Sequence, residues 1–413
     1  MRISRLRRGG ICLAAALSMG GCSDFVTVQN PNIVEAGGIN PDVDGALIAY
    51  SAFQDFVAGF GDIALYTAWF TTEAWTGDSS EDRSEVGRRA IDPANPRLNT
   101  DVWIRFSRGL ATTENTRDIL LTASDATKNI HHARVNLAAG YSYLLMAETF
   151  CRGTARGGPV LTTAEMLNLA TERLTSARDI GLAAGGAPGT LIVNAASVGL
   201  GRALLQAGKA AEAAAAVRNV PANFEYLLYT QDDPANRARL GNRMWEATVD
   251  RPSLVVPPVY RAAADAGDPR IRYQNTGLRA YDGFLPMYAQ RKYPSWAASY
   301  RLATGLEARY IAVEAAGDQG AMLNFVNERR AAGNLAAVSG LTGDALLTEF
   351  LAQKSLDFWL EGRRMGDFRR HGALVPNVAQ PGEVFYKPAA GPVGNGMCFP
   401  VPLAETSANS NFR

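Results

Sequence analysis

Acidic side chains offer the most direct route to chemistry in this chain, because two neighbouring carboxylates are enough to hydrolyse a glycosidic bond. Glu73 and Asp78 lie close together in the sequence, and Asp232 directly precedes Asp233. Acids are common in surface loops, however, and the sequence has no Gly-x-Ser-x-Gly turn and no phosphate-binding loop. The histidines are too scattered for a metal cluster, namely His131, His132 and His371. We therefore expect no catalytic residue, no bound metal and no cofactor.

Aromatic residues outside the helical patterns indicate sugar binding without catalysis. A pyranose needs a flat aromatic face, with acid, amide and arginine groups around it for the hydroxyls. Aromatic residues in loops also pack into cores or contact partner proteins. We interpret two groups as candidate ligand-binding residues, the first being Glu73, Trp75, Asp78 and Arg83, and the second being Tyr288, Arg291, Tyr293 and Trp296.

Apolar residues recur at three- and four-residue steps along most of the chain, which predicts amphipathic helices. Thr162 and Glu165 have the spacing of a capping box at the start of one of them. Residues 222–300 show no sustained period, so we expect a long irregular region with minor β structure there. The predicted helices are Asp44–Phe70, Asp101–Ala123, Ala133–Phe150, Thr163–Ala184, Ala195–Ala207, Ala210–Asn219, Arg301–Ala316, Gln319–Ala332 and Asp344–Leu360.

The succession of these helices predicts an all-α fold built from tetratricopeptide-like helix pairs. Leu204–Ala213 resembles the helix-turn-helix of a tetratricopeptide repeat, with Gly208 at the turn and Pro221 closing the unit. The 413 residues, 47% of them hydrophobic, are enough for a large core. We predict one domain at 45–413, whose helical core covers about 101–221 and 301–372.

The N-terminus has the features of a lipoprotein signal. Arginines at residues 2–8 precede the apolar run Ile11–Ser18, which is too short to span a bilayer. Leu17–Cys22 then resembles a bacterial lipobox, in which the cysteine thiol receives a diacylglyceryl group. We predict a signal peptide at 1–21, lipidation of Cys22 and a tether at 22–44. Ser23 after the cysteine favours sorting to the outer membrane.

Composition argues against a nucleic-acid partner. Four of the 41 basic residues precede Cys22, whereas all 40 acidic residues follow it. The mature chain therefore has no basic excess with which to neutralise phosphates.

Two cysteines, Cys151 and Cys398, remain after the signal peptide and the lipidated cysteine. In an oxidising compartment such a pair favours a disulfide, and two separate buried thiols are the alternative.

Glu361, Arg364 and Asp367 are spaced three residues apart. They share one helical face if a helix continues through Gly362. We predict a structural role, in which Arg364 pairs with both carboxylates and holds the C-terminal tail against the helices. A catalytic pair of carboxylates beside an arginine is the alternative interpretation.

Several blocks in the last third resemble the SusD/RagB lipoproteins. The lipobox and Asn30-Pro31-Asn32 fit the same family at the other end of the chain. The chain departs from the family at Gln353–Leu356, where a charged run is usual, and at Gly366, where an aromatic residue is common. The resembling blocks are Glu307–Ala315, Leu323–Val326 with Arg329, Arg330 and Gly333, Phe358–Arg370, and Phe399–Glu405 with Asn409 and Asn411.

The resemblance implies a lipid-anchored protein of the outer membrane that faces the cell surface. Such proteins bind an oligosaccharide and deliver it to a SusC-like, TonB-dependent β-barrel. Ligand sites in the family lie in loops after the first helices, which favours the group around Trp75. Peptide uptake is the alternative within the family, and a helical-repeat envelope scaffold or a glycan hydrolase is the alternative outside it.

Overall fold

The computed structural model describes residues 38–412, most of which are helical. The predicted signal peptide at 1–21, Cys22 and residues 22–37 of the predicted tether lie outside the described residues. Helix α1 (Pro41–Phe70) begins at a proline and is capped by the side chain of Asn40, which accepts a hydrogen bond from the Asp42 amide. The predicted tether boundary at residue 44 is therefore wrong, because residues 41–44 belong to α1.

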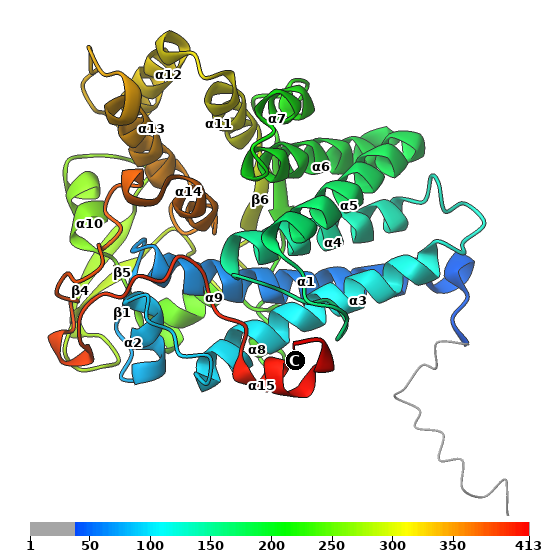
Figure 1. The fold of residues 1–413 in the computed structure, drawn as a ribbon, viewed down its shortest axis with the longest axis horizontal. Coiled ribbons are helices and arrows are strands. Elements are labelled where there is room, and N and C mark those ends of the chain that lie inside the picture. Colours follow the sequence, from blue (N-terminus) through cyan, green and yellow to red (C-terminus); the bar gives the residue numbers. More distant parts are fainter. Residues whose placement is uncertain (1–37, 413) are drawn as a thin grey trace, which may run out of the picture.

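Paired helices form the larger part of the molecule. Helix α1 packs against α3 and α4, and each later helix of the stack packs against the next one, in the order α3, α4, α5, α6, α7, α11, α12 and α13 (Figure 1). The prediction of an all-α fold of tetratricopeptide-like pairs with minor β structure is confirmed. The other helices are α2 (Glu81–Gly87), α3 (Ile104–Leu120), α4 (Ile130–Thr149), α5 (Thr163–Ala184), α6 (Gly186–Gln206), α7 (Ala210–Val217), α8 (Arg237–Leu240), α9 (Arg243–Trp245), α10 (Pro258–Asp265), α11 (Gly305–Ala316), α12 (Gln319–Ala332), α13 (Gly343–Asp357), α14 (Arg364–His371) and α15 (Leu403–Ala408).

Short-range sequence patterns predicted some of the helix ends correctly. Helix α5 has its predicted bounds, and Thr162 and Glu165 form the predicted capping box. The helix predicted at Arg301–Ala316 instead begins at Gly305, because Tyr300–Thr304 forms strand β6. Thr304 then caps α11 by accepting a hydrogen bond from the Glu307 amide. Pairing with a distant strand decided this boundary.

Residues 218–304, between α7 and α11, form an insertion of short elements. They lie mainly on the side of the stack where Figure 1 shows β4, β5 and α10. Three two-stranded antiparallel sheets are present among the described residues, pairing β1 with β3, β2 with β6 and β4 with β5. The strands are β1 (Trp75–Thr76), β2 (Glu225–Leu228), β3 (Leu254–Val255), β4 (Tyr273–Arg279), β5 (Pro286–Gln290) and β6 (Tyr300–Thr304).

The pairing predicted within the Glu361–Asp367 block is wrong. Helix α13 ends at Asp357, and Gly362 has a φ of +69°, so the three residues do not share one helical face. Arg364 contacts neither carboxylate; it donates to the carbonyls of Thr71 and Pro376 and to the Ser355 hydroxyl. Asp367 pairs instead with Lys354 and Arg370.

Glu361 is the centre of a buried charge network. Its carboxylate accepts from Lys292 Nζ at 2.5 Å, from Arg301 Nε at 2.9 Å and from Arg363 Nη1 at 2.7 Å. Lys292 and Arg301 come from the insertion, so this carboxylate joins the insertion to the helical stack. Burial alone would raise its pKa, but the three cations outweigh burial and lower the pKa to about 2.

The network continues into the helical stack. Arg363 Nε donates to Glu307 of α11 at 2.8 Å, and Glu307 lies 3.5 Å from Arg202 of α6. Arg202 in turn donates to Glu148 of α4. These side chains are all less than a tenth exposed, so their charges are compensated by one another rather than by water.

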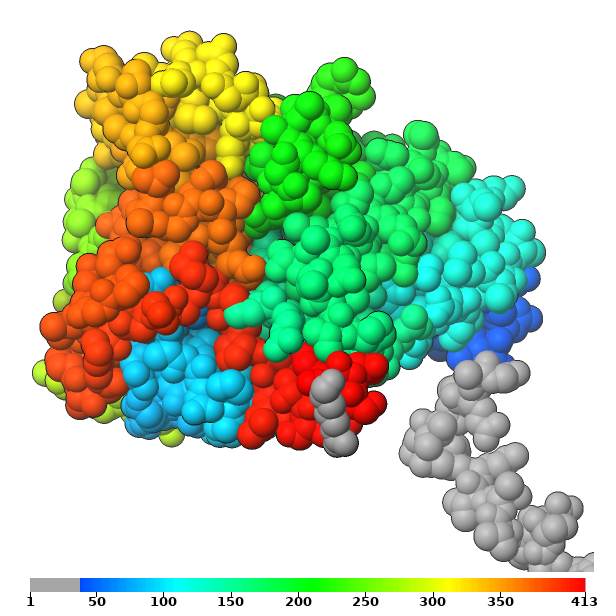
Figure 2. Space-filling model, in the orientation of Figure 1, coloured from blue at the N-terminus to red at the C-terminus, as the bar shows by residue number. Residues whose placement is uncertain are grey.

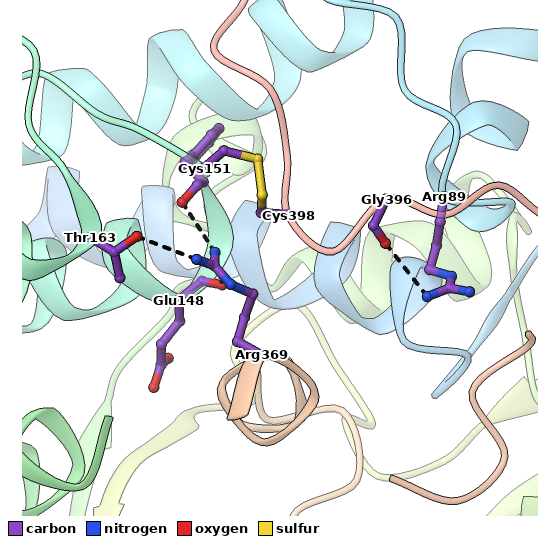
Figure 3. Close-up of a disulfide and its surroundings, with 8 residues drawn as sticks. Arg89, Glu148, Cys151, Thr163, Arg369, Gly396 and Cys398 are labelled. Atoms are coloured by element: carbon purple, nitrogen blue, oxygen red, sulfur yellow. Dashed lines mark hydrogen bonds between the residues drawn. A yellow bond between two sulfur atoms is a disulfide. The ribbon is translucent and has the colours of Figure 1, made fainter. Parts of the chain in front are cut away.

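A disulfide joins Cys151 to Cys398, with the two Cα atoms 5.2 Å apart (Figure 3). The bond links the end of α4 to the C-terminal segment across 247 residues. Beside it, Arg369 of α14 donates to the Phe150 carbonyl at 3.2 Å and to the Thr163 hydroxyl at 3.3 Å. The C-terminal segment is thus held covalently to the middle of the stack.

The C-terminal segment also covers the residues that follow α1. Figure 2 shows it, in orange and red, against the light-blue residues around α2. The amides of Gly394, Gly396 and Leu403 donate to backbone carbonyls of residues 88–93. Segments from the two ends of the described chain therefore support each other.

We expect Glu361→Gln to lower the free energy of unfolding by about 3–5 kcal/mol, because buried Arg363 and partly buried Lys292 and Arg301 lose their compensating charge. The pKa of about 2 lies below that of an unfolded glutamate. The stabilisation by Glu361 is therefore present above about pH 4.5 and is lost as the pH falls through about 2. Urea unfolding at pH 7 and pH 3 measures both effects.

Glu225→Gln is the matched control, because Glu225 is half-exposed and contacts Arg301 only at 3.4 Å. We expect a change below about 1 kcal/mol for this control. A Glu361→Gln protein as stable as the control at pH 7 would contradict the role given to the network.

Candidate functional site

A polar cavity of about 210 Å³ lies beside the C-terminal half of α1. Three segments far apart in the sequence build it: α1 itself, residues 83–105, and residues 243–253. Five arginines and three acids dominate its lining. The lining residues are Asp62, Leu65, Tyr66, Trp69, Arg83, Arg97, Asp101, Arg105, Arg243, Glu246, Ala247, Arg251 and Ser253.

Arg83 organises one wall of this cavity. Its guanidinium pairs with Asp78 at 2.6 Å and with Asp101 at 2.8 Å, and its Nε donates to the Tyr66 hydroxyl. Tyr66 donates to Asp101 at 2.6 Å. Burial raises the pKa of Asp101. Hydrogen bonds from Tyr66 and Thr100 and the charge of Arg83 lower this pKa by more than burial raises it, so the net pKa lies below its ordinary value. Asp101 is therefore ionised and fixed.

Asp62 also lines the cavity, and its pKa shifts in the opposite direction to that of Asp101. It is 4% exposed and lies 3.1 Å from Arg243 Nε and 3.4 Å from Arg105 Nη1. Burial raises its pKa to about 7, more than Arg243 lowers it, and the negative charge of Asp101 adds to the rise. The cavity thus contains one carboxylate that stays ionised and one that gains a proton near neutral pH.

Trp69 supplies an unused hydrogen-bond donor at this site. The residue lines the cavity, and its indole Nε1 is buried with no hydrogen-bond partner within residues 38–412. Buried donors without partners are rare in folded proteins, and this one belongs to a residue that lines the cavity. The lining therefore combines guanidinium donors with carboxylate acceptors.

The first predicted group is only partly at this site. Arg83 lines the cavity, but Asp78 is fully buried behind it, bound by Arg83 and Arg251. Glu73 is 1% exposed and accepts from the Leu360 amide, so its assignment as a ligand contact is corrected. The same correction applies to Asp78, because its oxygens already bind internal donors. Trp75 is half-buried, with its ring stacked on Tyr386 at 4.5 Å.

The second predicted group does not come together around one cavity. Tyr293 is buried and donates to the Leu360 carbonyl, so it serves the fold and its assignment as a ligand contact is corrected. Tyr288 lies under the guanidinium of Arg261, and Trp296 lies under that of Arg237. Arg291 binds Gln274 on the neighbouring strand. Tyr288 and Trp296 stay half-exposed on different parts of the insertion.

A second cavity, of about 420 Å³, surrounds the Glu361 network. Its aromatic residue, Tyr293, is buried, and its carboxylates, Asp357 and Glu361, are each bound by several internal cations. Its polar groups are therefore largely satisfied within the protein. The cavity beside α1 is the better candidate because it keeps an unpaired donor.

Sequence reasoning missed most of the cavity lining. One signal was available: Asp62 interrupts the apolar run Phe60–Phe70, and a lone acid in a buried helix is uncommon. Arg243, Glu246 and Arg251 had no such signal, because only long-range packing brings the insertion against α1.

Two further findings concern residues 38–412. No cluster of three or more histidine, cysteine, aspartate or glutamate side chains in this range is arranged to hold a metal ion. Within the same range, no helix has the length and apolar character needed to cross a membrane.

The raised pKa of Asp62 predicts a pH-dependent stability. Because the folded pKa of about 7 exceeds the ordinary value of 3.8, the stabilisation is fully present below about pH 3.8 and is lost as the pH rises through 7. Between pH 5 and pH 8 we expect the wild type to lose roughly 2–4 kcal/mol of unfolding free energy relative to Asp62→Asn. Asp55→Asn, on the same helix at its salt bridge with Arg239, serves as the control and keeps the wild-type profile. Parallel profiles for all three proteins would contradict this titration.

The fold is similar to several solved structures. A SusD superfamily protein from Bacteroides vulgatus aligns over 90% of this chain and 97% of its own, with a TM-score of 0.62 and 16% identity. A SusD-like carbohydrate-binding protein from Bacteroides fragilis aligns over 88% and 98%, with a TM-score of 0.64 and 15% identity. Surface glycan-binding protein A from Bacteroides thetaiotaomicron, solved with laminarihexaose, aligns over 89% and 97%, with a TM-score of 0.66 and 14% identity.

The sequence matches no protein-family model and no curated protein. The similarity therefore lies in the fold rather than in the sequence, and it extends over nearly the whole length of each compared structure. It agrees with the sequence blocks that resemble SusD/RagB lipoproteins. The chain has the fold of the SusD superfamily.

Proposed function

We propose that this protein captures oligosaccharides at the outer membrane and leaves their bonds intact. The observation that carries the proposal is the cavity beside α1, where arginine donors alternate with carboxylate acceptors. Each sugar hydroxyl both donates and accepts, so such a lining matches a sugar better than a singly charged or apolar ligand. The likeness to SusD-like proteins, one of them solved with laminarihexaose, supports the same class of ligand.

The rim of the cavity gives the ligand its first contacts. Arg97 and Arg105 have side chains about two-fifths exposed, and each contacts one wall carboxylate, Asp101 at 3.6 Å and Asp62 at 3.4 Å. These long contacts leave guanidinium donors that can turn toward a ligand. Trp69, which also lines the cavity, has an indole Nε1 without a hydrogen-bond partner among the described residues.

Hydrolysis is the second candidate, and one observation favours it. The pKa of Asp62 is raised and that of Asp101 is lowered within one cavity, which is the pattern of a general acid and its ionised partner. The burial of Asp62 between Arg105 and Arg243 weighs against it, because a general acid must reach the glycosidic oxygen. If the purified protein releases sugar products and Asp62→Asn does not, hydrolysis replaces capture.

We further propose that the protein delivers its ligand to a SusC-like, TonB-dependent β-barrel from a lipid anchor at Cys22, facing the cell surface. The SusD fold and the lipobox-like sequence before Cys22 support this arrangement. The protein then needs reversible affinity and a position beside the barrel, with no reaction of its own.

A glycan and peptide array tests the ligand class with the mature, lipid-free chain. We expect oligosaccharides to bind, and Arg97→Ala and Arg105→Ala each to lower the affinity about ten-fold or more, because each loses a charged hydrogen-bond donor. Arg239→Ala is the matched control, an exposed arginine paired with Asp55 outside the cavity lining. Binding of peptides alone would instead support the peptide alternative, and unchanged affinities in both rim variants would place the site elsewhere.

Cys22→Ser tests the anchor. A thioether-linked lipid cannot form on serine, so we expect the variant to incorporate no labelled fatty acid and to leave the membrane fraction. Two or three acyl chains hold a protein firmly on a membrane, whereas the Cys22→Ser variant would carry none. Wild-type protein found free in the cytosol with residues 1–21 still attached would contradict lipidation.

A further inference from the structure

The first half of α1 is apolar on two opposite sides. Its inner side includes Ala49 and Phe56, which are buried in the stack. Its outer side carries Val43, Leu47 and Tyr50, whose exposed fractions are 75%, 74% and 55%. A helix at the surface of a globular protein normally turns polar residues toward water. Packing of the core therefore does not account for the outer apolar residues.

Val43, Leu47 and Tyr50 form one continuous stripe. They are spaced four and three residues apart within α1, so their side chains are neighbours on the same side of the helix. Apolar side chains scattered singly on a surface need no explanation, whereas a contiguous group marks a contact surface. We name this stripe the outer α1 face.

The outer α1 face lies close to where the described chain begins. Figure 1 shows this end of α1 and strand β4 at opposite ends of the long axis, and Figure 2 shows the start of α1, in dark blue, on the surface. Residues 23–40 separate Cys22 from α1 and reach at most about 65 Å. A lipid on Cys22 therefore keeps the outer α1 face near the bilayer at a high effective concentration.

The groups beside this face suit the boundary between water and lipid. Arg134 of α4 has its guanidinium carbon 4.5 Å from the centre of the Tyr50 ring, and the His131 ring centre lies 5.8 Å from the same point. Tyrosine rings and arginine side chains are favoured at the level of lipid headgroups, because each has an apolar body and a polar end. Leu47 and Val43, about one and two turns nearer the helix start, are purely aliphatic.

The acids in the first turn of α1 lie outside this stripe. Asp42 accepts from the Ser124 amide at 2.8 Å, and Asp44 accepts from the Asn40 amide at 2.9 Å. Both carboxylates are thus bound by backbone amides. The outer α1 face itself has no charged residue, so its contact with a lipid surface needs no anionic lipid and responds little to salt.

The size of the face favours a lipid surface over a second copy of this chain. A stable protein interface takes about 20–30 residues from each partner, far more than this stripe supplies. Contact with a bilayer needs only a few apolar side chains when an anchor already holds the protein there.

We infer that the outer α1 face rests on the bilayer surface, with Val43 and Leu47 entering the boundary between headgroups and acyl chains. This inference rests on the lipid anchor of the proposed function. It goes beyond anchoring, because contact along α1 fixes which side of the helical stack turns toward the membrane.

The test uses the mature chain with a hexahistidine tag in place of Cys22, held on phosphatidylcholine vesicles by a nickel-chelating lipid. Ser51→Cys places a thiol on the exposed side of α1 for a polarity-sensitive fluorophore. Because Cys151 and Cys398 are bonded to each other, the new thiol takes the label.

We expect the emission to shift to shorter wavelength on the vesicles and to be quenched at least about two-fold by a spin-labelled lipid in the same bilayer. Replacing Val43 and Leu47 together by serine should abolish the shift and the quenching. Leu278→Ser is the matched control, because Leu278 is 71% exposed in β4, at the other end of the molecule in Figure 1. This control should keep the wild-type signal, and circular dichroism checks the fold of every variant.

An unquenched wild-type protein on the vesicles, or quenching unchanged by the double variant, would overturn this inference. A shift that appears without vesicles and grows with protein concentration would assign the face to a second copy and overturn the inference as well. Because the tag replaces the lipid, these results are independent of lipidation, which Cys22→Ser tests separately.

Discussion

Compensation of the buried Glu361 carboxylate is the constraint on which the rest of the structure depends. The three cations around it come from two places, the insertion and the turn before α14. A carboxylate removed from water is tolerated only while these partners stay in place. These contacts fix the insertion against the helical stack. The ion pairs from Arg363 to Glu307 and from Glu307 to Arg202 extend the network to α6, and Arg202 donates to Glu148 of α4.

The cavity beside α1 is a consequence of that docking. Arg243 and Arg251 belong to the insertion, whereas Asp62 and Trp69 belong to α1, so the two halves of the lining meet only when the insertion is seated. The turn between β4 and β5 belongs to the same insertion, and its amides at Tyr281 and Asp282 donate to the carbonyls of Pro252 and Gly77. A capturing protein built in this way has its polar contacts placed by one rigid attachment, which suits reversible binding.

Several expectations from the sequence failed for a common reason. The predicted helical face through Glu361, Arg364 and Asp367 assumed a continuous helix, but Gly362 has a positive φ and redirects the chain. Glu73 and Asp78 have the composition of a sugar site, yet packing turned both inward to internal donors. Composition and spacing do not report which way a side chain points once segments far apart in the sequence pack together.

The sequence by itself determined what depends on short-range order. The period of the apolar residues gave the succession of helices, and the Thr162–Glu165 spacing gave one helix start, because both arise within a few turns of chain. Tertiary structure decided which of the two cysteine alternatives holds, which cations surround Glu361 and which residues line the cavity. Each of these depends on contacts between residues that are far apart in the chain, and such contacts leave no periodic trace in the sequence.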